Sequence, residues 1–385
     1  MRGIYFDNAA SSYPKAPGVG EAMANYIDSV GANISRASYW EATEAGLETL
    51  RLREKLCALF GFSHPELAVL TPGMTFGLNQ ALKGYLKPGD HAIVSSMEHN
   101  AMMRPLSQLC AQGVAFDRIP CDGEGLFDPC DVRPLIRPNT RVVAMLHASN
   151  VSGGILPVEE VGKICRERGI AFVLDAAQSA GHLGVDFEKL GLSALCAPGH
   201  KGLLGPQGIG AMLLKPEFAK QLEPLVAGGT GSRSDSEDQP GLFPDRFESG
   251  TLNLPGIYGL SRAIDYIAQM GVGRIHEREM RLCRRFLEGV SDLKDVRVLG
   301  PKGLEKRVAV AALDFTKGDN AIAASELERS YGIYTRCGLH CAPSAHKTLG
   351  SFPQGAVRFS FGAFNTEEQV DEAVRAVRAV SDSRK

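Results

Sequence analysis

Short β-rich runs, each bounded by Gly, Pro, Asn or Asp, alternate with helical stretches between residues 66 and 215. Strands that alternate with helices predict a mostly parallel sheet with helices on both faces. Seven runs can be separated: ELAVL (66–70), HAIVSS (91–96), AFDRIP (115–120), RVVAMLH (141–147), AFVLD (171–175), SALCA (193–197) and GAMLLK (210–215). The sequence therefore predicts an α/β fold with a mostly parallel seven-stranded sheet in a large domain.

A second group of strands follows a helical region near residues 256–290. Its members are VRVLG (296–300), RVAVAALDF (307–315), IYTRC (333–337) and AVRFSF (356–361), and the helix TEEQVDEAVRAVRAV follows them. This order predicts a smaller α+β domain. We expect residues 16–255 to form the large domain, and residues 1–15 and 256–385 to form the small one. The stretch 228–246, rich in Gly, Ser, Asp and Pro, predicts a long loop.

Composition excludes several classes of protein. The 385 residues carry a net charge of -2, which provides no basic field for nucleic acid or an anionic membrane. No apolar run approaches the roughly 18 residues that span a bilayer, and the N-terminus lacks the apolar core of a signal peptide. The nine cysteines have no paired spacing, which favours reduced thiols. We expect a cytoplasmic protein with no metal site and no nucleic-acid or membrane partner.

Polar residues follow several of the predicted strands. They are Thr71-Pro-Gly-Met-Thr75, Glu98-His99-Asn100, His147-Ala-Ser-Asn150 and Asp175-Ala-Ala-Gln178, and a fifth segment contributes Pro198-Gly199-His200-Lys201. In open α/β sheets, ligands bind beyond the carboxyl ends of the parallel strands. The sequence therefore predicts the functional site at this edge of the sheet.

Each of these residues has both an ordinary and a functional interpretation. Thr75 opens a helix as a cap, or presents the helix start to a phosphate. Asp175 forms a structural ion pair, or faces a cation such as a protonated pyridine nitrogen. His99 packs in the interior or contacts a ligand, and Lys201 is a surface-loop lysine or an amine nucleophile. Together, a phosphate cradle, a buried acid, an imidazole and a lysine are what pyridoxal phosphate requires.

With these motifs the chain resembles the fold type I pyridoxal-phosphate enzymes, and within them the class V aminotransferase family, which contains cysteine desulfurases and selenocysteine lyases. The resemblance covers nearly the whole chain. Beyond the strand ends it rests on YFDNAASSYPK (5–15), FESGTLNLPGI (247–257), RCGLHCAP (336–343) and VRFSFGAFNTEEQVD (357–371).

The resemblance implies roles for the residues that would surround the cofactor ring. Lys201 would bind pyridoxal 5'-phosphate covalently through its amine. Asp175 would pair with the pyridinium nitrogen, His99 would stack on the ring, and Gln178 would reach the phenolic oxygen.

The resemblance also implies how phosphate and substrate would be held. The phosphate would contact Thr75, His200 and, from a second subunit, Thr251, so that a homodimer is expected. Arg358 would bind the substrate carboxylate bidentately with Asn150 beside it, a task that suits the planar guanidinium.

By the same resemblance, Cys341 would determine which reaction the protein catalyses. It lies where a group of cysteine desulfurases keeps the cysteine that accepts sulfur from L-cysteine, releases L-alanine and passes the sulfur to an acceptor protein. Its thiolate would form through His340 or through the substrate's own thiol. We interpret Cys337 as structural, although a relay role remains open.

Other functions share most of these residues. A selenocysteine lyase acting on L-selenocysteine would use nearly the same set, and an aminotransferase, lyase or epimerase of this family would not need Cys341. A non-catalytic scaffold is a further alternative, against which the intact Lys201 and Asp175 argue.

The chain departs from the family pattern at two places. Pro198 stands where the family usually has a Ser or Thr whose hydroxyl binds phosphate, so we expect weaker cofactor retention. The segment NISRASY (33–39) lacks the second histidine of similar desulfurases, which leaves the substrate contacts on that side open.

Overall fold

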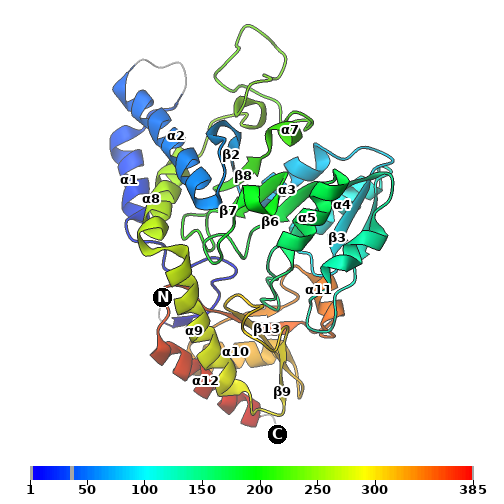
Figure 1. The fold of residues 1–385 in the computed structure, drawn as a ribbon. Helices are drawn as coiled ribbons and strands as arrows, with labels where there is room; N and C mark the ends of the chain where they lie inside the picture. The colour runs from blue at the N-terminus through cyan, green and yellow to red at the C-terminus, as the bar shows by residue number, and fades with distance from the viewer. Residues whose placement is uncertain (1–2, 35–38, 384–385) are drawn as a thin grey trace.

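The computed structural model describes residues 3–34 and 39–383 of the chain (Figure 1). The substrate contacts considered for segment 33–39 fall mainly on residues 35–38, which lie outside the described residues. Within the described ranges, no helix is long and apolar enough to cross a membrane.

A seven-stranded sheet forms the centre of the larger part of the molecule, as predicted. Its strand β8 runs antiparallel to both neighbours, and the other neighbouring pairs are parallel. Every strand agrees with its predicted run to within two residues. The order across the sheet is β2 (Ala68–Thr71), β8 (Gly210–Leu214), β7 (Ala194–Pro198), β6 (Ala171–Asp175), β5 (Thr140–Leu146), β3 (His91–Ser95) and β4 (Ala115–Ile119).

Helices bury most of this sheet, which explains why the central strands are almost continuously apolar. All five residues of β6 and of β7 are buried. In Figure 1, one group of helices lies to the left of the strands and the other lies around them on the right. The left group is α1 (Val19–Asn25), α2 (Trp40–Phe60) and α8 (Leu254–Met270), and the right group is α3 (Met74–Lys83), α4 (Asn100–Cys110) and α5 (Val158–Arg168).

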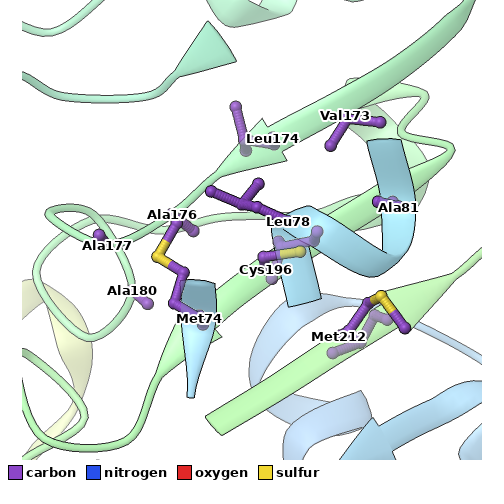
Figure 2. Packing of buried hydrophobic residues seen from close by; sticks show 14 of the residues in the cluster. Met74, Leu78, Ala81, Val173, Leu174, Ala176, Ala177, Ala180, Cys196 and Met212 are labelled. Carbon is purple, nitrogen blue, oxygen red and sulfur yellow. The ribbon is translucent and has the colours of Figure 1, made fainter. Parts of the chain in front are cut away.

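Helix α3 lies unusually close to the sheet. A Cβ atom added at Gly77 would stand 3.1 Å from the Cys196 sulfur and 3.5 Å from Cβ of Met212, so a larger residue would push the helix outward. Figure 2 shows Leu78 of α3 packed among the side chains of the neighbouring strands. This close packing determines where the first residues of α3 lie.

The second part of the chain builds a four-stranded antiparallel sheet. Its order is β12 (Arg336–Gly338), β13 (Ala356–Ser360), β10 (Val310–Phe315) and β9 (Val296–Leu299). Its helices are α9 (Val272–Val290), α10 (Asn320–Tyr331), α11 (Pro343–Thr348) and α12 (Glu367–Asp382). The predicted small α+β arrangement is present.

The expectation of one strand over IYTRC (333–337) is wrong. Residues Ile333–Tyr334 form β11, which pairs in parallel with β1 (Ile4–Tyr5), and only then does the chain enter β12. The partner of β11 comes from the start of the chain, so a local pattern does not reveal the division.

The domain assignment, with residues 16–255 in one domain and residues 1–15 and 256–385 in the other, stays a proposal. Phe6 is buried in the core of the second sheet, which supports grouping the N-terminal segment with that sheet. Ile257 and Leu260 of α8, however, are buried in the core of the first sheet. Helix α8 thus packs on the large sheet, although the proposed assignment counts it with the small domain.

The predicted loop at 228–246 contains no helix or strand before the 3₁₀ turn at Asp245–Phe247. Its C-terminal end is anchored by a buried ion pair between Arg53 of α2 and Glu248, with nitrogen–oxygen distances of 2.8 and 2.6 Å. Glu248 also accepts a hydrogen bond from the Leu70 amide at 2.6 Å. This carboxylate joins α2, β2 and the end of the loop.

We predict that Arg53→Met lowers the free energy of unfolding by about 3–5 kcal/mol, because it leaves the Glu248 carboxylate buried without its cation. Arg51→Met is the matched control, since Arg51 forms an ion pair with Glu44 from a side chain that is 47% exposed. Urea unfolding of both variants measures the difference. Equal losses of unfolding free energy in the two variants would contradict the conclusion that burial makes the Arg53–Glu248 pair important for stability.

Candidate active site

A cavity of about 810 Å³ opens at the carboxyl ends of the parallel strands, between the two sheets. Five of the residues singled out from the sequence reach it from the strand ends of the large sheet: Thr75, His99, Asn150, Asp175 and Gln178. Four more reach it from the β7–β8 connection and the second sheet: His200, Lys201, Cys341 and Arg358.

Thr251 does not line this cavity and is exposed in its own chain. Its predicted contact to phosphate in a second subunit stays a prediction.

The start of α3 borders the cavity, as the sequence predicted for the region of Thr75. Gly73 precedes the helix with no side chain capping it, and Gly73, Met74 and Thr75 all line the cavity. The first amide groups of a helix have no intrahelical partner and favour an anion. The alternative of Thr75 as the cap is not observed, since the helix begins at Met74.

Asp175 is the last residue of β6 and is 3% exposed. One carboxylate oxygen accepts a hydrogen bond from the Ala177 amide at 2.9 Å. Burial raises the pKa of Asp175 to about 6, against the opposing effects of the Ala177 amide and of Lys201. A buried carboxylate of this kind becomes fully charged when a cation binds beside it.

Lys201 lies in the turn between β7 and β8 and lines the same cavity. Burial lowers the pKa of Lys201 to about 8, although Asp175 pulls in the opposite direction. A larger fraction of the amine is therefore neutral near physiological pH than in a solvated lysine. A neutral amine is the form that attacks a carbonyl carbon.

The Lys201 turn is held from the N-terminal segment. The carbonyl oxygen of His200 accepts hydrogen bonds from the Ser12 amide at 2.9 Å and from the Lys15 amine at 3.0 Å. The hydroxyls of Ser11 and Ser12 approach the same oxygen at 3.3 and 3.2 Å. Four donors on one carbonyl determine the direction of the peptide that leads into Lys201.

His99 caps α4, because its Nδ1 accepts a hydrogen bond from the Ala101 amide at 3.0 Å. Burial, with a smaller contribution from Lys201, lowers the pKa of His99 to about 4, so the ring is neutral and its orientation is restricted. Gln178 donates one amide hydrogen to the Ala9 carbonyl at 2.9 Å, which leaves its second hydrogen for a ligand.

Arg358 of β13 is 2% exposed and donates to the Asn150 carbonyl and to an Asp7 oxygen, both at 2.9 Å. Three of its five N–H groups remain for a ligand. Asp7 also accepts from Arg336, with nitrogen–oxygen distances of 2.7 to 3.1 Å. One carboxylate from the N-terminal segment thus joins two arginines that line the cavity.

Cys341 lies in the turn between β12 and α11 and is exposed at the cavity. Two routes were open for deprotonating this thiol, His340 or the substrate's own thiol, and the contacts of His340 argue against the first. Its Nε2 lies 3.1 Å from the Arg336 carbonyl and its Nδ1 lies 3.2 Å from Nε2 of His346, so both nitrogens are engaged. Burial, reinforced by Arg358, lowers the pKa of His340 to about 3.

The polar atoms of the cavity fit a phosphorylated pyridine aldehyde. Within the described residues, His200 Nδ1, Asn150 Oδ1 and Arg358 Nε are buried without a hydrogen-bond partner. Asp175 offers a buried acid to a ring cation, Lys201 offers an amine to an aldehyde, and the start of α3 offers amides to a phosphate. No cluster of His, Cys, Asp or Glu suited to a metal ion occurs in the described part of the chain.

The fold and the site define a class: the chain has the fold type I architecture, with a lysine, a buried acid and an imidazole at the strand ends. The chain belongs to the class V aminotransferase family, whose model, described as "Aminotransferase class-V", matches residues 4–373.

Several known proteins that are similar to this chain are named as cysteine desulfurases. A "Probable cysteine desulfurase" of Pyrococcus abyssi is 34% identical over 96% of this chain and 92% of its own length. One of Methanothermobacter thermautotrophicus is 32% identical over 95% and 92%. The apo structure of a cysteine desulfurase from Thermococcus onnurineus NA1 superimposes with a TM-score of 0.93 at 34% identity, covering 99% of this chain and 95% of that one.

Two site residues received no role from the sequence. Asp7 and Arg336 were quoted only within motifs, although they connect the N-terminal segment to Arg358. The unusual polarity of YFDNAASSYPK was the available signal, but its partners are too distant in sequence to be inferred locally.

Pro198 is buried at the end of β7 and lines the cavity. We predict that Pro198→Ser strengthens binding of pyridoxal phosphate by roughly tenfold to a hundredfold, since a hydrogen bond to a charged group contributes about 1.5–3 kcal/mol. Pro198→Ala is the matched control, because it makes the same backbone change without a hydroxyl. Equilibrium dialysis measures the affinity, and equal affinity of the Ser and Ala variants would refute the account.

The lowered pKa of Lys201 gives a second prediction. Its amine is protonated below about pH 8 and neutral above it. The rate at which apoprotein captures pyridoxal phosphate should therefore rise with pH and level off above about 8, whereas an ordinary lysine would give a rise extending past about pH 10. Stopped-flow absorbance measures this rate, with Lys201→Ala as the blank. A capture rate that still rises at about pH 9.5 would contradict the lowered pKa of Lys201.

Proposed function

We propose that the chain is a pyridoxal-phosphate-dependent cysteine desulfurase that converts L-cysteine to L-alanine and takes the sulfur on Cys341 as a persulfide. The observation that carries the proposal is that Cys341 and Lys201 line one cavity, at opposite sides of the interface between the two sheets. Membership in the class V family and the names of the similar proteins support it.

In this proposal Lys201, Asp175, His99 and Gln178 hold the cofactor ring, and the start of α3 with Thr75 and His200 holds its phosphate. Bound pyridoxal phosphate supplies an electron sink for the Cα carbon of an amino acid. The negative charge of Asp175 would favour the protonated form of the ring nitrogen.

The protein's own side chains carry out the remaining steps of the proposed reaction. Arg358, beside Asn150, orients the substrate carboxylate, and the Lys201 amine moves the proton from the substrate Cα. The Cys341 sulfur then forms a bond to the substrate sulfur while the carbon–sulfur bond of the substrate breaks. L-Cysteine and the Cys341 thiol become L-alanine and a persulfide, so the atoms balance without an oxidant. His340 has no free nitrogen for the thiol proton, which passes to the substrate or to water.

The partners belong to the same proposal. An exposed Cys341 is accessible to an acceptor protein that takes the sulfur onward. Thr251, exposed and away from the cavity of its own chain, is free to reach the site of a second subunit in a homodimer. Nine free cysteines suit the reducing cytoplasm.

We predict that incubation of the holoenzyme with L-cysteine adds one sulfur atom to Cys341, as peptide mass spectrometry will show. Cys341→Ala should lose L-cysteine turnover by at least about a hundredfold, because the nucleophile is gone. Cys337→Ala is the matched control and should keep it. A Cys341→Ala enzyme that still turns over L-cysteine would exclude the persulfide route. Higher activity of the parent on L-selenocysteine, retained in Cys341→Ala, would instead indicate a selenocysteine lyase.

A further inference from the structure

Three buried side chains form a continuous hydrogen-bond chain behind the Cys341 turn. Ser351 Oγ lies 2.7 Å from His346 Nδ1, and His346 Nε2 lies 3.2 Å from His340 Nδ1. His340 Nε2 then lies 3.1 Å from the Arg336 carbonyl oxygen. His346 is 0% exposed, and His340 is 8% exposed. None of the steps proposed above uses His346 or Ser351.

The direction of this chain follows from its last member. A carbonyl oxygen only accepts, so His340 must carry its proton on Nε2 and accept at Nδ1. His346 then donates from Nε2 and accepts the Ser351 hydroxyl at Nδ1. Burial lowers the pKa of His346 to about 4, which keeps its ring neutral and this single arrangement of protons in place.

The backbone that this chain supports is held in an uncommon conformation. His340 and Cys341 have φ values of 49° and 55°, in the left-handed region that residues other than glycine rarely adopt. Two further bonds hold the same turn: Asn150 Nδ2 donates to the His340 carbonyl, and the Asn100 amide donates to the Cys341 carbonyl, both at 2.7 Å. Such strain persists only where the surroundings over-determine it.

We propose that the Ser351–His346–His340 chain is a positioning device that holds the Cys341 turn in its left-handed conformation and so directs the thiol into the cavity. The inference rests on the proposed function, because it assigns Cys341 the reacting sulfur. His346 and Ser351 act through His340 and are positioning residues. The imidazole of His346 is suited to this task because it spans the interval between a hydroxyl and a second ring with one acceptor and one donor.

The test compares two substitutions of His346 in the holoenzyme. His346→Phe keeps a ring of similar size and removes both hydrogen bonds, leaving His340 Nδ1 and the Ser351 hydroxyl without partners. His346→Gln keeps an N–H that can donate to His340. His64→Gln is the matched control, since the His64 side chain is 39% exposed beside Glu66 and does not line the cavity.

Two readouts are needed. We expect His346→Phe to lower kcat for L-cysteine by about tenfold to a hundredfold with little change in KM, because the thiol is misplaced while Arg358 remains. Hydrogen exchange in the peptide covering residues 338–346 should rise several-fold without substrate. His346→Gln should keep most of the parental kcat and protection, and His64→Gln should keep both.

Parental kcat and exchange in His346→Phe would overturn the proposal. Equal losses in His346→Gln and His346→Phe would also overturn it, because ring packing rather than hydrogen bonding would then hold the turn. If His346→Phe does not fold, Ser351→Ala decides: increased exchange over 338–346 supports the chain, and parental exchange refutes it. The exchange measurement needs no catalysis, so it remains decisive even if the parent does not desulfurate cysteine and the proposed function fails.

Discussion

Asp175 and Lys201 are an acid and an amine buried in one cavity, and within the described residues no ion pair joins them. The rest of the site depends on this arrangement. Burial raises the pKa of Asp175 and lowers that of Lys201, so both groups lose part of their charge in the free protein. A ligand that brings a cation to one and a carbonyl to the other relieves the cost of burying both. Parallel strand ends bring these two residues together without any flexible loop.

The surroundings of the cavity are correspondingly rigid. Gly77 lets α3 approach the sheet, which determines where the helix start faces the cavity. Four donors converge on the His200 carbonyl, and buried neutral histidines support the turn of Cys341. Functional side chains thus project from regular elements or from turns whose backbone groups are already bonded, as accurate positioning of reacting groups requires.

Most of the architecture could be predicted from the sequence because its determinants are local. Apolar runs bounded by turn residues predicted all seven strands of the large sheet, and the polar residues after those runs predicted seven cavity residues. The other two, Cys341 and Arg358, were predicted only by the resemblance to the family. The division of β11 from β12 and the role of Asp7 depend on partners at the other end of the chain, which no local pattern contains. The sequence left His340 open as one of two routes for deprotonating Cys341, because it does not show that His346 and the Arg336 carbonyl occupy both nitrogens of the His340 ring.

The contact between Asp7 and Arg358 spans 351 residues of the sequence. A growing polypeptide can complete the large sheet long before β13 emerges from the ribosome, but it cannot close this contact until then. Loop-closure entropy makes such distant pairings late events in folding. A partly synthesised chain can therefore already form the strand ends around Lys201. Arg358, the arginine proposed to bind the substrate carboxylate, is synthesised much later. Products truncated before β13 would be expected to lack binding of the substrate carboxylate while retaining much of the large sheet.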